Sequence, residues 1–453
     1  MIQQGYKEFL EAKSQLAGGS GFAPTFFPKG LFDFQEFLTD WSIRTGRGAM
    51  FADCGMGKSV MQLAWAENVV RHTNKPVLVM APLSVSTQTV EEAEKFGIEA
   101  IRVMDGKHKG AGIVVTNYER LHYFDAKDFG GVVCDESSII KNFDGSRKGE
   151  ITEFMKKTPY RLLCTATASP NDYIELGTSS EALGYLGYMD MLSMFFKNDE
   201  DSCHPAFIGS KWRFKRHAED HFWRWVASWA RACRKPSDLG FSDGNFKLPD
   251  LTVHEHEVDS PLQNGAMLVS PATSLQEQRE DSKKTLQARC ALAAELLEKS
   301  ESAVSWCHTN TEADALVRMI SGAVQVSGAD CDERKEEVFR AFRKGEVRVL
   351  VTKPKIAAFG MNWQHCAHMV YFPTHSFEQY YQAIRRSWRF GQKNAVRIEV
   401  VTSSAQAGVL GNLKRKQVAC EGMFEQLVAH MNNAVNINRM SQFGTEQELP
   451  KWL

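Results

Sequence analysis

Residues 52–66 read ADCGMGKSVMQLAWA, and they follow the β-rich run GAMFADC (48–54). The stretch begins with a strand pattern, continues through closely spaced glycines and enters a helical pattern. A phosphate-binding loop needs this order, because its backbone N–H groups and the helix N-terminus together hold an anion. The stretch therefore predicts a strand, a phosphate loop and a helix in an α/β domain.

The chemistry of the loop follows from its residues. Gly55 and Gly57, with Met56 between them, allow backbone N–H groups to close around phosphate oxygens. Lys58 would bring a positive charge to the outer phosphates, and the Ser59 hydroxyl can bind Mg²⁺. The strict pattern of such loops has glycine at the position of Ala52. The lysine and the serine hydroxyl nevertheless lead us to expect ATP and Mg²⁺ as cofactors.

The rest of the chain repeats the alternation of apolar runs with helical patterns. The predicted strands of the first half are 48–54, 77–82, 101–104, 112–118, 131–136 and 161–167, and those of the second half are 303–309, 324–328, 347–352, 368–373 and 396–402. Continuous Val/Ile/Leu runs between helices are typical of buried parallel strands. Because 453 residues exceed what one core organises, we expect two parallel-sheet α/β domains.

Composition is that of a soluble globular protein, with 43% hydrophobic and 24% charged residues. The formal net charge is -1, so any nucleic-acid contact must come from local basic patches. No run approaches a membrane span, and the N-terminus has no apolar signal core. We expect a location in the cytoplasm of a bacterial or phage-infected cell, and no membrane partner.

The ten cysteines lack paired spacing, which favours reduced thiols. Three Cys/His pairs, at 203–204, 307–308 and 366–368, lie in different regions and do not favour a zinc site.

Two adjacent acids end the run GVVCDESSIIKN (131–142). In P-loop enzymes an acid at the end of a neighbouring strand holds Mg²⁺ with the loop hydroxyl, and Asp135 fits that role. Glu136 can then orient and deprotonate a water for in-line attack on the γ-phosphate. The alternative is that both acids cap a strand end in solvent.

Two further segments resemble superfamily 2 helicases. RLLCTATASPND (161–172) resembles motif III, and YQAIRRSWRFGQ (381–392) resembles motif VI with the Gly-Gln ending of the Swi/Snf-like branch. Other segments fall in the expected order: 31–41 resembles the adenine-reading segment, 77–96 motif Ia, 113–121 motif Ib, and 326–352 with 357–372 the approach to motif V and motif V itself. The likeness covers most of residues 30–430, and the compact size is similar to bacteriophage-encoded helicases.

This resemblance implies two RecA-like lobes that bind ATP, with nucleic acid lying across both. It implies that Gln35 reads the adenine edge and that Phe32 stacks on the base, although Phe32 could equally be a core aromatic residue. The implied arginine fingers are Arg386 and Arg389, which would stabilise the charge of phosphoryl transfer. Further implied roles are coupling for Thr165, Thr167 and Gln382, and sensing of nucleotide by Gly360 and Asn362.

The sequence departs from the family pattern at two further places. Ser137 and Ser138 follow the acid pair where alanine and histidine are usual, which puts the strength of coupling in doubt. Arg385 stands where glycine usually precedes the first finger, so one of three arginines could bind nucleic acid instead.

Nucleic-acid backbone contacts are expected from polar residues at strand ends, which suit phosphate and carry no sequence code. The candidates are Pro82, Ser84, Ser86, Thr116, Asn117, Thr309, Asn310, Thr352, Lys353 and Lys355. The alternative for each is that it satisfies a turn.

The segment KWRFKRHAEDHFWRWVASWARACRK (211–235) holds eight Lys/Arg, two acids and four tryptophans. Basic charge interleaved with aromatic residues suits nucleic acid. However, the spacing of Phe222, Trp225, Val226 and Trp229 describes a buried helical stripe. A basic outer face would then consist of Arg213, Lys215, Arg216 and Arg224.

The sequence therefore predicts an N-terminal segment (1–30), a first RecA-like lobe (31–178), a helical basic-aromatic insertion (179–250), a second lobe (251–430) and a C-terminal tail (431–453). The predicted function is an ATP-dependent DNA translocase or helicase acting on duplex or branched DNA. The alternatives are an RNA helicase, a DNA-binding protein with weakly coupled ATPase, and a P-loop kinase or simple NTPase.

Overall fold

The computed structural model describes residues 19–442 except 109, 111, 142–144, 169–172, 199–211, 261–274 and 358–360, and within it the side chains of 84, 146, 245, 275, 407 and 431–442 are not described. The chain divides into two compact units. The first comprises Met1–Ala81, Thr89–Ser242 and Cys420–Leu453, and the second comprises Pro82–Gln88 and Asp243–Ala419.

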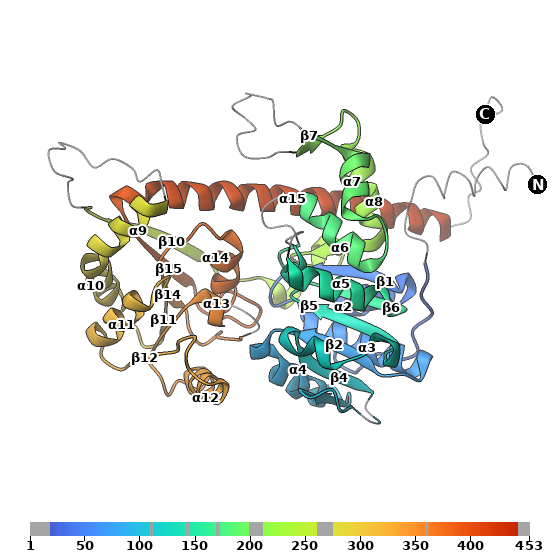
Figure 1. The fold of residues 1–453 in the computed structure, drawn as a ribbon, viewed down its shortest axis with the longest axis horizontal. Helices are drawn as coiled ribbons and strands as arrows, with labels where there is room; N and C mark the ends of the chain where they lie inside the picture. Colours follow the sequence, from blue (N-terminus) through green and yellow to red (C-terminus); the bar gives the residue numbers. More distant parts are fainter. Residues whose placement is uncertain are drawn as a thin grey trace, which may run out of the picture. The chain divides into compact units, whose positions relative to one another are not determined.

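The first unit is built on a seven-stranded parallel sheet in the order β3-β4-β2-β5-β6-β1-β9 (Figure 1). Its strands are β1 (Arg47–Ala52), β2 (Val77–Ala81), β3 (Ala100–Arg102), β4 (Ile113–Asn117), β5 (Gly131–Asp135), β6 (Tyr160–Cys164) and β9 (Ala230–Cys233). Helix α2 (Asp33–Thr45) precedes β1, and α3 (Lys58–Thr73), α4 (Leu83–Lys95) and α5 (Ser146–Lys156) lie between the first six strands. Helix α3 packs against β2, β4, β5 and β6, which fixes the loop before it at the carboxyl ends of the strands.

All six strands predicted in the first half are confirmed, but β9 was missed. It lies within the predicted helical insertion and pairs in parallel with β1, from Ala49 beside Ala230 to Ala52 beside Cys233. Its four residues are too few to show periodicity, and Arg231 interrupts them. The guanidinium of Arg231 is buried over the Trp41 ring at 4.5 Å and donates to the Ala227 carbonyl.

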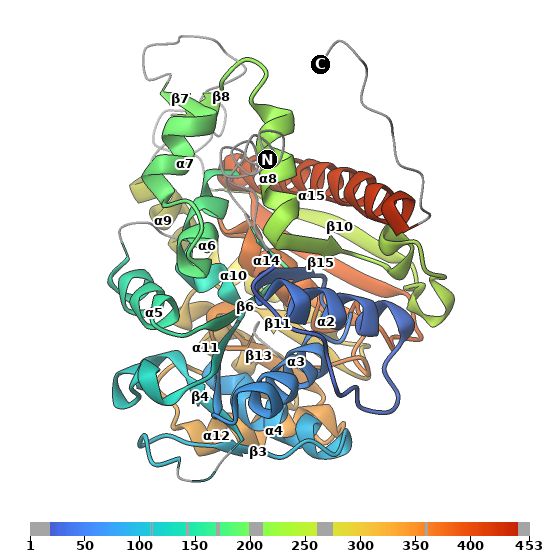
Figure 2. The same ribbon diagram turned by 90° about the vertical axis from the view of Figure 1, so that its right-hand side faces the viewer.

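The insertion belongs to the first unit as far as Ser242, and we call its helical part, whose helices Figure 2 labels, the aromatic module. It contains α6 (Leu176–Leu183), α7 (Tyr188–Phe195), an antiparallel pair of β7 (Phe196–Asn198) and β8 (Trp212–Phe214), and α8 (Glu219–Trp229). The stripe predicted on α8 is buried, with Phe222 at 5.5 Å from Phe195 and Trp225 at 5.5 Å from Trp229 between ring centroids. These aromatic residues therefore form the interior of the module.

The second unit has a six-stranded parallel sheet in the order β10-β15-β14-β11-β13-β12. Its strands are β10 (Leu251–Val258), β11 (Ala303–Trp306), β12 (Ala323–Gln325), β13 (Val349–Thr352), β14 (His368–Tyr371) and β15 (Val396–Ser403). The five predicted strands are confirmed, and β10 was missed. Its sequence, LTVHEHEV, contains two histidines and two glutamates and is mostly exposed, as suits a strand at the edge of a sheet.

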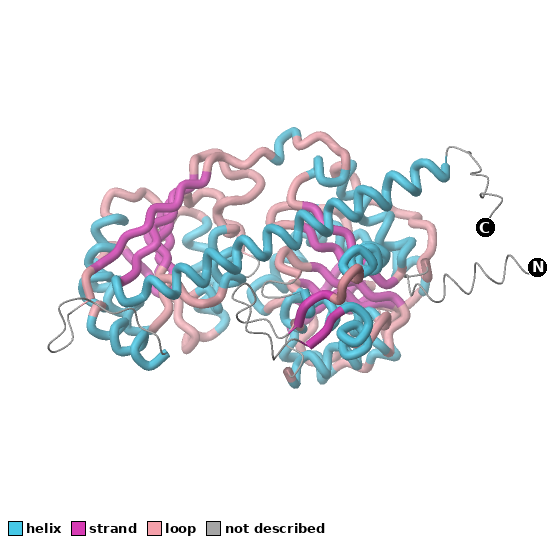
Figure 3. The backbone as a smooth tube through the Cα atoms, turned by 90° about the horizontal axis from the view of Figure 1, so that it is seen from above, coloured by secondary structure: helices cyan, strands magenta, loops and turns pink. Residues whose placement is uncertain are grey.

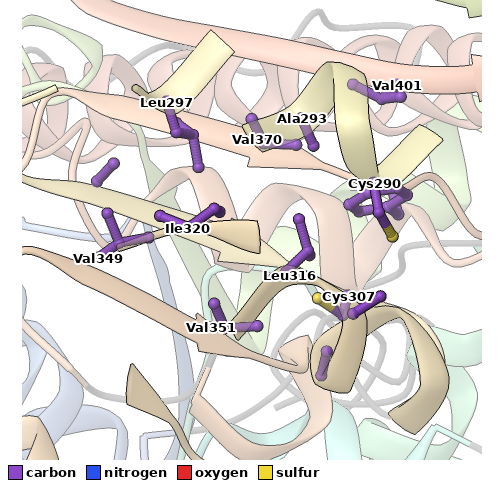
Figure 4. Close-up of a cluster of buried hydrophobic side chains, with 14 residues drawn as sticks. Cys290, Ala293, Leu297, Cys307, Leu316, Ile320, Val349, Val351, Val370 and Val401 are labelled. Atoms are coloured by element: carbon purple, nitrogen blue, oxygen red, sulfur yellow. The ribbon is translucent and has the colours of Figure 1, made fainter. Parts of the chain in front are cut away.

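The helices of the second unit cover this sheet and close its core. They are α9 (Leu275–Lys284), α10 (Leu286–Leu297), α11 (Asn310–Met319), α12 (Asp332–Arg343), α13 (Pro354–Ala357) and α14 (Phe377–Ile384). The sequence predicts one helix over 274–300, but α9 and α10 are separated at Thr285, whose hydroxyl donates to the Asp281 carbonyl. Cys290, Ala293 and Leu297 of α10 enter the core with α11, β13 and β14 (Figure 4).

The last helix extends into the segment predicted as a C-terminal tail from residue 431. Helix α15 runs without interruption over Ala407–Gln442 (Figure 3). From Cys420 onward it is grouped with the first unit, where the Arg234 guanidinium lies over the Phe424 ring at 4.6 Å. The boundary placed at residue 430 therefore falls inside a helix.

A buried carboxylate in the second unit leads to a prediction about pH. The Glu399 side chain is fully buried, and its Oε2 lies 2.6 Å from His256 Nε2. Burial alone would raise the pKa of Glu399, but the hydrogen bond from His256 and the charge of Arg397 outweigh it, so the pKa is lowered. The folded state then binds fewer protons than the unfolded state at acidic pH. The ionised Glu399 carboxylate therefore stabilises the fold at pH values above its pKa in the unfolded chain. This contribution is lost as the pH falls through its lower pKa in the folded protein.

Glu399→Gln is therefore expected to make unfolding less dependent on pH between about 5 and about 3. The free energy of unfolding in urea, measured at several pH values, checks this. Glu295→Gln, an exposed glutamate on α10, is the control and should keep the wild-type slope. An unchanged slope in Glu399→Gln would contradict the assignment.

Candidate functional site

The predicted phosphate loop has the backbone conformation that its glycines allow. Gly55 and Gly57 have φ values of 88° and 79°, in the left-handed region that favours glycine. Strand β1 ends at Ala52 and α3 begins at Lys58. Lys58 Nζ donates to the carbonyl oxygens of Ala52 at 3.0 Å and Asp53 at 3.4 Å, so the lysine lies across its own loop.

The pKa of Lys58 is raised. Burial acts in the opposite direction, but nearby Cys54, Glu136 and Asp135 together outweigh it. The ammonium group therefore stays charged at neutral pH, as binding of phosphate requires.

Gln35, on α2, is hydrogen-bonded to this loop. Its side chain is 5% exposed, its Nε2 donates to the Met56 carbonyl at 2.9 Å, and its Oε1 accepts from the Phe32 backbone at 3.1 Å. Phe32 is 42% exposed, so it is not a core aromatic residue. Reading of adenine by Gln35 stays a prediction, whereas the hydrogen bond to the loop is a role that the sequence did not indicate.

Gly57→Ala is expected to weaken ATP binding by about tenfold or more, equivalent to about 1.4 kcal/mol. A Cβ at this position would lie 2.2 Å from Gln35 Nε2, so the glutamine must release Met56. Gly97→Ala is the matched control, because Gly97 also has a positive φ, 67°, but has nothing within 4 Å of the added atom. Titration with a fluorescent ATP analogue measures both, and equal affinities would contradict the role of Gln35.

The two acids lie at the end of β5, which is separated from the phosphate-loop strand β1 by one strand. Strand β6 lies between β5 and β1, which corrects the expectation of a neighbouring strand. Asp135 and Glu136 are 7% and 6% exposed, so the alternative of a solvent-exposed strand cap is wrong. Burial first, and then the charge of Glu136, raise the pKa of Asp135 to about 6. Two buried carboxylates together favour the presence of a cation.

Glu136 has a strained backbone. Its φ and ψ are 51° and 52°, a left-handed conformation that costs a non-glycine residue about 1–3 kcal/mol and is concentrated at functional sites. The Thr165 hydroxyl donates to Glu136 Oε2 at 3.4 Å, and the Thr167 backbone donates to the Thr165 hydroxyl at 3.1 Å. The acid and the predicted coupling threonines are therefore brought together.

Polar atoms without partners gather at the carboxyl ends of these strands. Among the buried side-chain oxygens that have no hydrogen-bond partner in the described structure, four lie at or just after the ends of strands β4, β5 and β6: Thr116 Oγ1, Asn117 Oδ1, Ser137 Oγ and Thr167 Oγ1. Buried polar atoms of this kind usually indicate a missing ligand or water. Ser137 and Ser138 are 2% and 4% exposed, so the departure from the usual histidine lies inside the site.

The donor set fits Mg²⁺ bound together with a nucleotide. No cluster of three or more His, Cys, Asp or Glu side chains suited to a metal occurs among the residues that the structure describes. Mg²⁺ in nucleotide enzymes needs no such cluster, because one or two protein oxygens complete a shell of waters and phosphates. Ser59, in the first turn of α3, and Asp135 are the residues that would hold it.

In the second unit, Arg386 and Arg389 converge on one backbone atom. Their Nη1 atoms donate to the Met361 carbonyl at 3.3 and 3.4 Å, and Arg386 Nε donates to the Gln382 carbonyl at 3.0 Å. Arg386 is 2% exposed, whereas Arg389 is half-buried. The two predicted fingers therefore differ in environment. Arg385 packs over the Trp388 ring at 4.4 Å, which gives it a structural role.

The structure describes two of the three other residues predicted in this region. The Gln382 carboxamide and Asn362 Oδ1 are buried and have no hydrogen-bond partner within the described chain. Gly360 lies outside the described residues.

Several predicted nucleic-acid contacts are already used within their own unit. The Thr309 hydroxyl caps α11 by accepting from the Glu312 backbone at 3.2 Å, and the Thr352 hydroxyl donates to the Val326 carbonyl at 3.0 Å. The Ser86 hydroxyl donates to the Leu83 carbonyl at 2.9 Å. Thr309 and Ser86 therefore satisfy local backbone groups, as the alternative predicted, whereas Thr352 bonds to a segment 26 residues away. The Ser84 side chain lies outside the described set.

Thr116 and Asn117 are buried, whereas seven other candidates are more accessible. Asn310, Lys355, Lys215, Arg216 and Arg224 are exposed, while Lys353 and Arg213 are half-buried. Lys215 Nζ donates to the Ser193 carbonyl, which anchors it at the aromatic module. No helix in the described part of the chain has the length and apolar character to cross a membrane.

Two site residues were missed by the sequence analysis. Gln62 Nε2 donates to Asp135 Oδ1 at 2.6 Å, and the Tyr118 hydroxyl donates to the Asp135 carbonyl. Gln62 lies three residues after Ser59 on the same helical face, but nothing in the local sequence places it beside Asp135, 73 residues away.

Comparison with known proteins supports the helicase resemblance in the second unit. Residues 287–391 match the family described as helicase conserved C-terminal domain. No curated protein matches the chain significantly. Among solved structures, the chain is similar to the SWI2/SNF2 ATPase core of Sulfolobus solfataricus in complex with dsDNA, with a TM-score of 0.43 and 18% identity, covering 84% of this chain and 90% of that chain. The second unit thus carries a segment similar to the helicase conserved C-terminal domain, and that segment contains both Arg386 and Arg389.

Proposed function

We propose that this protein is an ATP-dependent DNA translocase or helicase. The observation that carries the proposal is the gathering of Lys58, Asp135 and Glu136 at the carboxyl ends of β1 and β5, in a chain whose second unit matches a helicase domain. A kinase or simple NTPase does not account for that second domain.

Each of these residues has its own role in the proposed hydrolysis of ATP. Lys58 and the backbone of the phosphate loop bind the β- and γ-phosphates, and Glu136 orients a water and accepts its proton as it attacks the γ-phosphorus. Mg²⁺, when bound with ATP, neutralises charge that develops on the phosphate oxygens. Arg389 of the second unit adds the positive charge that completes stabilisation of the transition state. Hydrolysis therefore requires residues of both units.

DNA is the proposed partner, duplex or branched. The Gly391-Gln392 ending of the motif VI segment supports duplex DNA by resemblance to the Swi/Snf-like branch. Support for backbone contacts comes from the exposed basic residues Lys215, Arg216 and Arg224, which the aromatic module holds on one short stretch of chain. The proposed location is the cytoplasm of a bacterial or phage-infected cell.

One observation favours a second candidate, a DNA-binding protein with weakly coupled ATPase. Ser137 and Ser138 stand in place of the usual Ala-His pair, and the Ser137 hydroxyl is buried without a partner in the described structure. A serine cannot supply the charge that a histidine supplies when protonated.

The test compares the ATPase rate with duplex DNA, single-stranded DNA and RNA, beside triplex displacement with and without ATP. We expect stimulation by duplex DNA and displacement that depends on ATP. Stimulation by RNA alone would identify an RNA helicase. DNA binding with an ATPase rate that no nucleic acid changes would favour the weakly coupled protein.

A further inference from the structure

Gln62 connects the phosphate-loop helix to the buried acid at the end of β5. It lies on α3, is 1% exposed, and donates from Nε2 to Asp135 Oδ1 at 2.6 Å. Residues three apart on a helix are neighbours on one face, so Gln62 stands next to Ser59, the other residue that would hold Mg²⁺. One helix therefore provides both a ligand oxygen and a donor to the second ligand.

The backbone of Asp135 is held by a different residue. The Tyr118 hydroxyl, on a side chain 4% exposed, donates to the Asp135 carbonyl and lies 3.1 Å from Cys134 Sγ. Because the main chain is fixed by Tyr118 and by the β5 ladder, removal of Gln62 leaves the strand in place. Gln62 contacts the Asp135 carboxylate itself, to which the Glu136 backbone also donates.

The chemistry of an amide suits this task. An ionised carboxylate offers about four acceptor sites, so an amide N–H can occupy one on Oδ1 and leave others for a cation. An amide is neutral and does not cancel the charge that attracts the metal, as a lysine in this position would. A carboxylate without such a partner must be ordered at the moment when the cation binds.

We infer that Gln62 is a positioning residue for the divalent cation that accompanies ATP, acting through the orientation of Asp135. The inference rests on the proposed ATP-binding function and assigns Gln62 to the same site. Loss of hydrogen-bonding partners of metal ligands typically lowers metal affinity by about 10–100-fold.

The experiment measures binding of Mn²⁺, as a probe for Mg²⁺, by electron paramagnetic resonance in the presence of a non-hydrolysable ATP analogue. Gln62→Met keeps the length and approximate volume of the side chain without the donor. Gln62→Asn keeps the amide on a side chain one methylene shorter. We expect both variants to need about 10–100-fold more Mn²⁺ for half-occupancy, with unchanged affinity for the analogue in EDTA.

A second buried amide on the same helix provides the matched control. Asn68 donates to the Phe26 and Ala64 carbonyls at 2.7 and 2.8 Å, away from the acid pair. Asn68→Leu should lower thermal stability and leave the Mn²⁺ titration at the wild-type value, which separates positioning from a general structural role.

The outcomes are distinguishable. If the wild-type protein binds no Mn²⁺ with the analogue, the proposed ATP site itself fails. If the wild type binds Mn²⁺ and both Gln62 variants bind it equally well, the inference on Gln62 is overturned. Loss of the folded state in both variants, seen by circular dichroism, would also overturn it, because Gln62 would then be a residue required for folding.

Discussion

Glu136→Gln is expected to lower the ATP turnover rate by about 10²–10⁴-fold, the usual contribution of a general base. Glutamine keeps the size of the side chain and can accept from the Thr165 hydroxyl, but it cannot take a proton from water. The affinity for ATP should therefore stay close to the wild-type value. Single-turnover hydrolysis and titration with an ATP analogue measure the two quantities separately.

Two features of the structure make this test specific. Glu136 is buried and adopts a left-handed backbone, so its side chain is held in one place rather than free in solvent. Glu150→Gln, an exposed glutamate on α5, serves as the control and should leave turnover unchanged. Wild-type turnover in Glu136→Gln would show that the base is a different group.

Arg389→Ala is expected to reduce turnover by about 10³–10⁵-fold, as loss of an arginine finger does in phosphoryl transfer. Binding of ATP should be kept, because Lys58 and the phosphate loop belong to the first unit. DNA binding should also be kept. Stopped-flow measurement of phosphate release, beside equilibrium binding of ATP and of duplex DNA, checks the three expectations.

Arg386 provides a contrast with Arg389. Its guanidinium is 2% exposed and donates to two backbone carbonyls, and each acceptor left without a donor costs about 1–3 kcal/mol. Arg386→Ala should therefore lower the free energy of unfolding as well as turnover, whereas Arg389→Ala should affect turnover almost alone. Arg334→Ala, in an exposed pair with Glu337, is the neutral control. Normal turnover in Arg389→Ala would remove the finger assignment.

The strands could be predicted where their residues are apolar on both faces. All eleven predicted runs are strands. Most of them are buried on both sides, which requires continuously apolar residues, whereas β3 and β12 are partly buried strands at the sheet edges. Besides the short antiparallel pair of β7 and β8, the strands that escaped prediction are β9 and β10, each at one edge of its parallel sheet. One is four residues long and contains Arg231, and the other alternates histidine and glutamate, so neither carries the apolar signature.

The site residues likewise fall into those that the local sequence reveals and those that it does not. The glycines, Lys58 and the adjacent acids could be identified because they lie within a few residues of one another in sequence. Gln62 could not, since its partner Asp135 is 73 residues away and nothing in the local sequence specifies that β5 ends opposite α3. The same holds for Gln35, whose amide reaches the loop from α2.

The sequence by itself determined the two parallel-sheet units, the phosphate loop and the acid pair. These depend on local chemistry, namely on which residues bury well, which tolerate a positive φ and which bind phosphate. Only the tertiary structure decided that Asp135 and Glu136 are buried, that Gln62 and Tyr118 hold Asp135, and that Arg386 is enclosed while Arg389 is not. The physical reason is that burial and hydrogen-bond partners are properties of the packed chain, set by segments far apart in sequence.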